Sequence, residues 1–149
     1  MSEKEFIIRP FLVRDSADVG VILFPNIFNY KILCGSKCYV ACFLDMPIGV
    51  VYCKVVRKSI HITHIAVRED FQGMGAGQDL LNFCLAKGSC FDCKTAVASV
   101  PLDSKHIKAH NFFKKTLGNF TYKNDPQYGE RLIFMGTVPK GELSGRLTD

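Results

Sequence analysis

The chain lacks any apolar run that approaches the roughly 18 residues of a membrane-spanning helix. Its first residues, Met-Ser-Glu-Lys-Glu, are too polar and acidic for a secretory signal. No repeat or linker divides the 149 residues, a length typical of one domain. These absences predict a soluble protein of the cytoplasm, with the nucleus left open, that has no membrane partner.

The seven cysteines lack the spacing of a metal site or a disulfide framework. Cys90 and Cys93 form a single C-x-x-C, and zinc would need a second pair or histidines at finger spacing, which do not follow. An odd number of cysteines, several of them at core-like positions, is typical of reduced thiols. We therefore expect no bound metal.

The net charge of +5 does not arise from one basic segment. The 19 lysines and arginines are scattered along the chain, and no motif of a nucleic-acid-binding module is present. We therefore expect solvated basic faces and no nucleic-acid partner. A positive balance still favours an acidic ligand, such as one that carries phosphates.

What the sequence does contain is a glycine-rich turn between a predicted strand and a predicted helix. Residues 59–67 alternate as in a strand, and apolar residues recur at helical spacing after residue 78. Between them, Gly73, Gly75 and Gly77 lack a Cβ, so backbone N–H groups can gather around an anion. The first turn of the helix adds its own N–H groups and the positive end of its dipole. The pattern predicts a backbone cradle for a diphosphate.

Two common nucleotide-binding turns do not fit this spacing. A P-loop ends in Gly-Lys-Ser/Thr, but Gly77 is followed by Gln78 and Asp79, which supply neither the lysine nor the hydroxyl. A dinucleotide fingerprint that starts with Gly73 and Gly75 requires its third glycine at position 78, which is glutamine. Both interpretations are excluded.

The turn instead resembles motif A of the GNAT superfamily of N-acetyltransferases. That motif is a hydrophobic strand end and four variable residues, followed by Gln/Arg-x-x-Gly-x-Gly/Ala. The corresponding residues here are Val67, Gln72, Gly75 and Gly77. Every defined position of the motif is matched.

Residues 104–120 are similar to the motif B helix of the same superfamily, whose pattern is Asn-x-x-Ala-x-x-Leu-Tyr followed by Gly-Phe. Ala109 and Phe112 match this pattern. His106 stands where asparagine is common and Phe113 where tyrosine is common, and the run up to Gly118 is one residue longer. The similarity to motif B is therefore partial.

The resemblance implies an α/β fold with a single GNAT-type domain over residues 1–139. Its central sheet would be mixed and mostly antiparallel, with about six to seven strands flanked by about four helices. Residues 140–149, which are polar and aperiodic, would form a loose tail. Apolar patterns predict strands over residues 6–11, 37–44, 48–56, 60–67, 95–100, 119–123 and 131–138, with a hairpin turn at 45–47. They predict one helix that is capped by residues 15–18 and ended by Pro25. Further helices are predicted over residues 26–33, 78–88 and 104–117.

The resemblance also implies that acetyl-CoA is the cosubstrate. The backbone of the glycine turn would hold the diphosphate, and the end of the preceding strand would align the pantetheine arm and supply an N–H donor to the oxyanion. The helix of residues 104–117 would reach the far end of the cosubstrate. The implied binding residues are Ile65, Ala66, Val67, Gln72, Gly73, Met74, Gly75, Ala76, Gly77, Asn111 and Lys114.

The implied reaction is direct attack of an amine on the thioester. An alkyl ammonium with a pKa near 10.4 is deprotonated in roughly one molecule per few thousand at pH 7, so a general base helps, by about 10²–10⁴-fold. His61 stands where lysine acetyltransferases of the superfamily carry a glutamate base, and His64 is a second candidate on the same strand. Because Phe113 has no proton to give to the departing thiolate, Tyr122 is a candidate acid, with Tyr128 or water as alternatives.

The sequence leaves the acceptor open between a protein or peptide lysine, an N-terminal amine, and a small amine or polyamine. It also leaves open whether the protein forms a homodimer. A function of another class is a non-catalytic acyl-CoA-binding regulatory module, which would share the glycine cradle and lack turnover.

Overall fold

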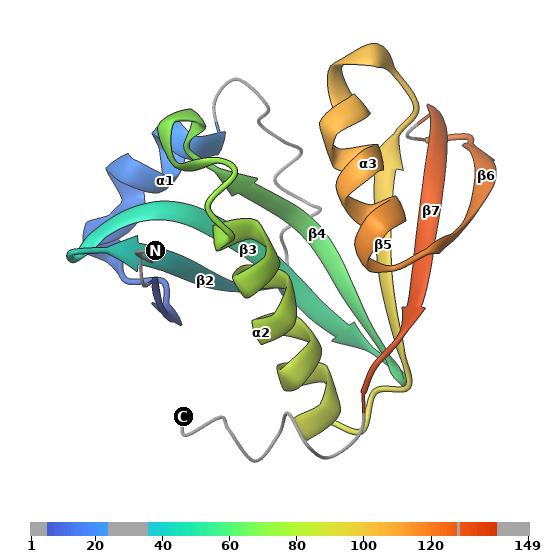
Figure 1. The fold of residues 1–149 in the computed structure, drawn as a ribbon. Coiled ribbons are helices and arrows are strands. Elements are labelled where there is room, and N and C mark those ends of the chain that lie inside the picture. Colours follow the sequence, from blue (N-terminus) through green and yellow to red (C-terminus); the bar gives the residue numbers. More distant parts are fainter. Residues whose placement is uncertain (1–5, 24–35, 128, 140–149) are drawn as a thin grey trace. The chain divides into compact units, whose positions relative to one another are not determined.

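The computed structural model describes residues 6–23, 36–127 and 129–139. The fold is α/β, with a seven-stranded mixed sheet in the order β1-β2-β3-β4-β5-β7-β6 (Figure 1). Three α-helices lie in the described residues, and the predicted helix over residues 26–33 lies outside them. The elements are β1 Ile7–Pro10, α1 Ser16–Leu23, β2 Lys37–Phe43, β3 Met46–Val56, β4 Ser59–Val67, α2 Ala76–Cys90, β5 Thr95–Pro101, α3 Ile107–Thr116, β6 Asn119–Asp125 and β7 Gly129–Thr137.

The predicted fold class is confirmed. One neighbouring pair of strands, β4 with β5, is parallel, whereas β1 with β2, β2 with β3, β5 with β7 and β6 with β7 are antiparallel. The chain forms two compact units, one of residues 1–54 and 63–84 and the other of residues 55–62 and 85–149. No helix in the described ranges is long and apolar enough to cross a membrane.

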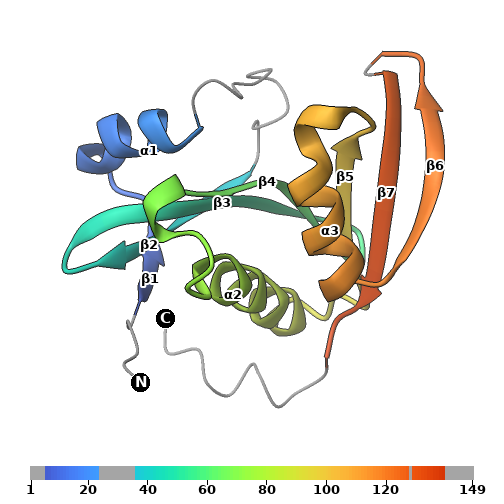
Figure 2. The ribbon, with the colours of Figure 1, turned by 45° about the horizontal axis from the view of Figure 1, so that its top comes forward.

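In the first unit, α1 covers one face of β2 and β3, and the first turns of α2 cover the opposite face (Figure 2). Val19 and Leu23 of α1 are buried against Val40 of β2 and Val50 of β3. Val19 and Leu23 are one helical turn apart, so they lie on the same face of α1, and the two strand valines lie on the face of the sheet that α1 covers. The helical and strand periodicities of the sequence therefore predict which side chains form this core.

The turn between β2 and β3 differs from the prediction. Residues 45–47 were expected to form it, but the turn is Leu44-Asp45, with φ angles of 52° and 72°. Two residues with positive φ match the right-handed twist of paired strands, although leucine pays a steric cost there. Pro47 lies in β3 opposite Cys42, where the register shifts, so the ladder tolerates its missing N–H.

Asp15 also has a role other than the predicted cap of α1. Its carboxylate accepts hydrogen bonds from the Arg9 guanidinium at 2.7 and 3.0 Å, and from the Leu12 N–H at 2.8 Å. It thereby closes the short 3-10 helix Val13–Asp15 and ties it to β1. Asp15 is 2% exposed, and the hydrogen bond from Arg9 holds the pKa of its carboxyl below the usual range.

In the second unit, β5, β7 and β6 form an antiparallel group against which α3 packs. Phe134 of β7 is fully buried, with its ring centroid 5.8 Å from that of Phe113 on α3. The end of α2 lies so close to the start of β4 that a Cβ at Gly88 would come within 2.9 Å of Ile60 Cγ2. The helix was expected to end near Gly88 and it ends at Cys90, so Gly88 lies in its last turn, where the missing Cβ permits this close packing.

Candidate functional site

The glycine turn joins the end of β4 to the start of α2, as the sequence predicts. A short 3-10 helix, Glu69–Phe71, follows the strand, and residues 72–75 lead into α2. Gly73 and Gly75 have φ angles of +83° and +94°, a region that favours glycine. A Cβ added at either residue would meet no atom within 4 Å. These two glycines are therefore required for backbone conformation, and they leave open space beside the turn.

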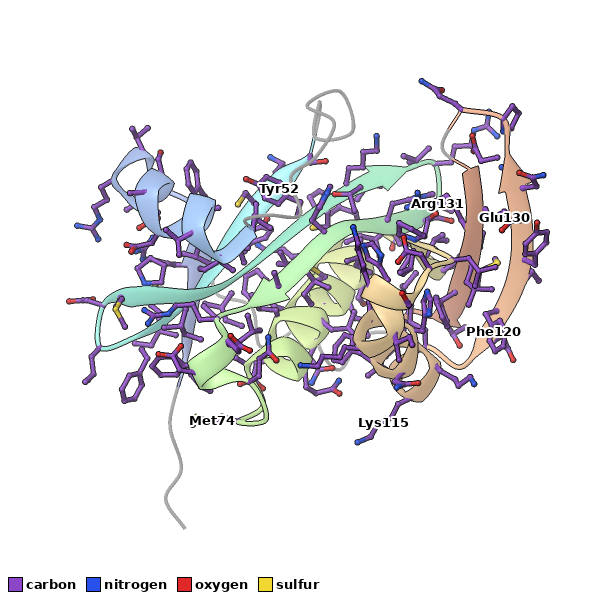
Figure 3. All side chains as sticks on the ribbon, turned by 90° about the horizontal axis from the view of Figure 1, so that it is seen from above. Tyr52, Met74, Lys115, Phe120, Glu130 and Arg131 are labelled. Carbon is purple, nitrogen blue, oxygen red and sulfur yellow. The ribbon has the colours of Figure 1, made fainter. Side chains whose placement is uncertain are left out.

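The start of α2 presents N–H groups at this turn. The Asp79 N–H donates to the Gly75 carbonyl at 2.9 Å and so begins the helical ladder. The N–H groups of residues 76–78 come before Asp79 in the chain and donate to no carbonyl within the helix. Ala76 and Leu80 are buried and anchor the helix start, whereas Met74 is 43% exposed at the turn (Figure 3). An anion can therefore reach the N–H groups and the positive end of the helix dipole.

The side chain of Gln72 points back to the strand. Its Nε2 donates to the Val67 carbonyl at 2.9 Å, and its backbone N–H donates to the Glu69 carbonyl at 3.3 Å. Both bonds close the loop between β4 and the glycines. The sequence predicts Gln72 as a ligand of the cosubstrate, and its side chain has the further role of fixing the turn to the end of the strand.

The backbone at the end of β4 has groups that point away from β3. The Arg68 N–H donates to the Ile48 carbonyl of β3 at 2.8 Å. Successive N–H groups of an extended strand point in opposite directions, so those of Val67 and Ile65 are directed away from β3. This is the stretch of backbone in which the resemblance places the oxyanion donor.

Arg68 and Phe71 support the loop, and sequence reasoning missed both. The Arg68 guanidinium pairs with Asp70 at 2.9 Å and lies 5.6 Å from the centroid of the Phe71 ring. That ring packs 5.6 Å from Phe43 at the end of β2. Arg68 and Phe71 occupy variable positions of motif A, so the sequence carries no signal for their contacts.

The two candidate bases lie three residues apart on β4 and belong to different compact units. His61 is half-buried and stands opposite Val97 in the parallel pairing of β4 with β5, which runs from Ser59 to Ile62 of β4. His64 is also half-buried, with its ring edge toward Tyr52 of β3 at a centroid distance of 6.1 Å. Their assignment as base stays a prediction.

Residues on α3 and β6 belong to the second unit. Asn111 and Lys114 are exposed on α3, and Lys114 Nζ lies 5.5 Å from the centroid of Phe120. Phe113, aligned with the motif tyrosine, is 3% exposed and belongs to the core. Its burial leaves unchanged the prediction that another group must protonate the departing thiolate, because phenylalanine has no proton to give.

Tyr122, the candidate acid, is 54% exposed on β6. Its hydroxyl donates to Glu130 Oε2 at 2.9 Å, and this hydrogen bond raises the pKa of Tyr122 above its usual value. The hydroxyl therefore keeps its proton at neutral pH and directs it at Glu130. Tyr128, the alternative, lies outside the described residues.

The glycine turn lies between a strand end and a helix start within a mixed sheet. This is the arrangement that the resemblance described above implies for an acyl-CoA-binding α/β protein. A model of the acetyltransferase (GNAT) family matches residues 9–118, which is most of the chain. The chain belongs to the GNAT family of acetyltransferases. The comparison with curated proteins finds no match.

Several solved structures share the fold. The ribosomal-protein-S18-alanine N-acetyltransferase of Escherichia coli is 15% identical, with a TM-score of 0.70 over 93% of this chain and 97% of that chain. A GNAT family acetyltransferase from Elizabethkingia anophelis with acetyl-CoA bound is 18% identical, with a TM-score of 0.67 over 91% and 100%. Arabidopsis thaliana Naa50, in complex with the bisubstrate analogue CoA-Ac-MVNAL, is 17% identical, with a TM-score of 0.66 over 87% and 97%.

Proposed function

We propose that this protein is an acetyl-CoA-dependent N-acetyltransferase that acts on a primary amine by direct attack in a ternary complex. The observation that carries the proposal is the backbone of the glycine turn. Gly73 and Gly75 hold left-handed conformations with open space beside them, directly before the start of α2. A diphosphate fits this combination of free space, N–H groups and helix dipole.

Acetyl-CoA, when bound, supplies the thioester carbon to which the amine nitrogen forms a bond while the bond to sulfur breaks. The N–H groups of Ile65 and Val67 point away from β3 and are the donors we assign to the oxyanion. The residues of the turn, 72–77, hold the diphosphate. Asn111 and Lys114 are assigned to the far end of the cosubstrate.

Two proton transfers complete the reaction. We assign His61 as the base that takes the proton from the attacking amine, with His64 as the alternative on the same strand. The departing thiolate must gain a proton, and Tyr122 is the side chain that we assign, with water as the alternative. Tyr122 would have to leave Glu130 in order to act, since its hydroxyl donates to that carboxylate.

A protein or peptide amine is the acceptor class we favour, and an N-terminal amine in particular. Two of the similar structures are named for this chemistry, the S18-alanine acetyltransferase and the Naa50 complex with a CoA-peptide analogue. An N-terminal amine has a pKa near 7.7–8.0, so a larger fraction is neutral at pH 7 than for lysine. A histidine base is then sufficient to collect the proton.

The second candidate is a non-catalytic acyl-CoA-binding module. It is favoured by the engagement of the Tyr122 hydroxyl with Glu130, and by Phe113, which has no proton to give at the position where motif B commonly carries tyrosine. Such a module would bind acetyl-CoA in the same cradle and release no thiol.

The test is release of free CoA thiol from acetyl-CoA with peptides that have a free N-terminus, N-terminally blocked lysine peptides, and polyamines. We expect amine-dependent release, fastest with a free N-terminus, and a decrease of about 10²-fold or more in His61→Ala. His64→Ala removes the alternative base from the same strand and should slow the release less than His61→Ala does. A larger decrease in His64→Ala would assign the base to His64. Binding of acetyl-CoA without release for any acceptor would support the regulatory module instead.

A further inference from the structure

The fold brings Lys94 close to Arg57 and Lys58, two adjacent cations that are far from it in the sequence. Arg57 and Lys58 form the turn between β3 and β4, and Lys94 precedes β5 (Figure 1). The Lys94 N–H donates to the Lys58 carbonyl at 2.7 Å, so the two loops lie against each other. The sequence predicts scattered basic residues on solvated faces, whereas the structure gathers these three at one end of the second unit.

Among residues 6–23, 36–127 and 129–139, neighbouring carboxylates do not balance the charge at this end. Arg57, Lys58 and Lys94 are exposed, and none of them has an ion pair within the described ranges. The carboxylate carried by the same two loops is Asp92, which is itself exposed. Three cations and one carboxylate leave this surface positive, and the chain as a whole carries +5.

Large apolar side chains are exposed beside the cations. Phe91 is 60% exposed, and Val55 and Val56 are each 41% exposed at the end of β3. The loop that carries Phe91 is fixed to α2, because the Phe91 N–H donates to Gly88 at 3.1 Å and the Cys93 N–H donates to the same carbonyl at 2.8 Å. Phe91 is therefore exposed on an ordered turn in the same loop as Lys94, which is bonded to the adjoining hairpin.

We propose that this surface, which we call the basic end, docks on an anionic lipid surface. The basic end comprises Val55, Val56, Arg57, Lys58, Phe91 and Lys94. Cations attract anionic headgroups, and apolar side chains beside them enter the boundary between headgroups and acyl chains. A nucleic acid would also satisfy the cations, but it offers no apolar partner to the exposed valines, which as consecutive residues of β3 point to opposite faces of the strand. The combination therefore favours a lipid surface over a nucleic acid.

Tryptophan fluorescence tests the proposal directly, because the chain has no native tryptophan. Phe91→Trp provides a single reporter at the basic end. We expect a blue shift that saturates with vesicles of phosphatidylcholine and phosphatidylserine, that weakens with added salt, and that is absent with phosphatidylcholine alone. Ile107→Trp is the matched probe, because Ile107 is 52% exposed on α3 of the same unit. Its emission should not shift.

The charges are tested in the Phe91→Trp background. Arg57→Gln, Lys58→Gln and Lys94→Gln together should weaken vesicle binding by about 10²-fold, since each cation contributes roughly fivefold, or ~1 kcal/mol. A control triple variant makes the same change in net charge on α3 and β6, and it should retain most of the binding. Its exposed target residues are Lys108, Lys115 and Lys123.

Three results would overturn the proposal. The first is the absence of a shift with phosphatidylserine vesicles, and the second is an equal loss of binding in both triple variants. The third is binding of a single-stranded RNA oligonucleotide by a protein that does not bind the vesicles, which would assign the basic end to nucleic acid.

Discussion

The side-chain nitrogen Nε2 of Gln72 donates a 2.9 Å hydrogen bond to the backbone carbonyl oxygen of Val67. One implied ligand of acetyl-CoA thus fixes the backbone of another, so the glycine turn and the strand end are held as one structure. The bond is made by an exposed side chain, and its loss should affect the geometry of the turn more than the stability of the protein.

Replacement of Gln72 by alanine should therefore weaken acetyl-CoA binding by about 3–10-fold, the effect of one hydrogen bond, with little change in Tm. Calorimetric titration and thermal unfolding measure the two effects. Gln78→Ala is the control, because the Gln78 side chain bonds to Asn82 at 3.1 Å one turn along α2. Equal affinities for the wild type and Gln72→Ala would show that the bond does not position the turn.

A second prediction separates the effect of backbone conformation on stability from the effect of steric crowding. An added Cβ has no neighbour within 4 Å at either Gly75 or Gly20, but Gly75 has φ +94° and Gly20 lies in α1 without a positive φ. Gly75→Ala should lower the free energy of unfolding by about 1–2 kcal/mol. Gly20→Ala should raise it by about 0.5–1 kcal/mol. Urea unfolding measures both, and effects of the same sign would contradict the described conformation of the turn.

A third prediction concerns acid stability. The folded-state pKa of Asp15 is lowered by Arg9, so its contribution to stability is present above the unfolded pKa near 3.9 and is lost as the pH falls through the lower folded value. Asp15→Asn should cost about 1–3 kcal/mol at pH 7, and the difference from wild type should shrink below about pH 4. Urea unfolding across this range measures it.

The exposed Asp18 of α1 provides the control for Asp15. Asp18→Asn should change the free energy of unfolding by at most about 1 kcal/mol, the scale of a charge near a helix N-terminus. A difference between wild type and Asp15→Asn that persists unchanged at low pH would exclude the ion pair with Arg9 as its source.

A fourth prediction concerns Tyr122. Because Glu130 raises the pKa of the Tyr122 hydroxyl, Glu130→Gln should lower that pKa toward the usual value near 10. Ultraviolet titration of the phenolate, with Tyr122→Phe subtracted, measures the shift. In the thiol-release assay, Tyr122→Phe should slow the reaction, whereas Glu130→Gln should not, since it leaves the hydroxyl free to donate elsewhere. Equal rates in wild type and Tyr122→Phe would leave water as the proton source.

The sequence predicted the elements around the site because those elements follow simple periodicities. Alternation along residues 59–67 and helical spacing after residue 78 place the glycine turn between β4 and α2. In the segment before α3, the Asp103 side chain accepts from the Lys105 N–H at 3.0 Å, as aspartate commonly does at a helix start. The sequence therefore predicts those elements whose structure is set by local backbone preference.

The remaining features depend on contacts between distant residues. Leu44 takes a left-handed conformation because strand pairing on both sides imposes it, although leucine alone does not favour it. Gly88 lies in the last turn of α2, where its missing Cβ leaves room for Ile60 of β4. Phe113 is buried because it packs against Phe134 of β7, with their ring centroids 5.8 Å apart. No local pattern in the sequence encodes these three outcomes.

The most direct test of the account is a calorimetric titration of acetyl-CoA into wild-type protein and into Gly75→Ala, with circular dichroism to show that both are folded. The account predicts one molecule of acetyl-CoA bound per wild-type chain, and weaker binding when the left-handed conformation at residue 75 is strained by a Cβ. Folded wild-type protein that binds no acetyl-CoA would contradict the assignment of the glycine turn as the diphosphate cradle.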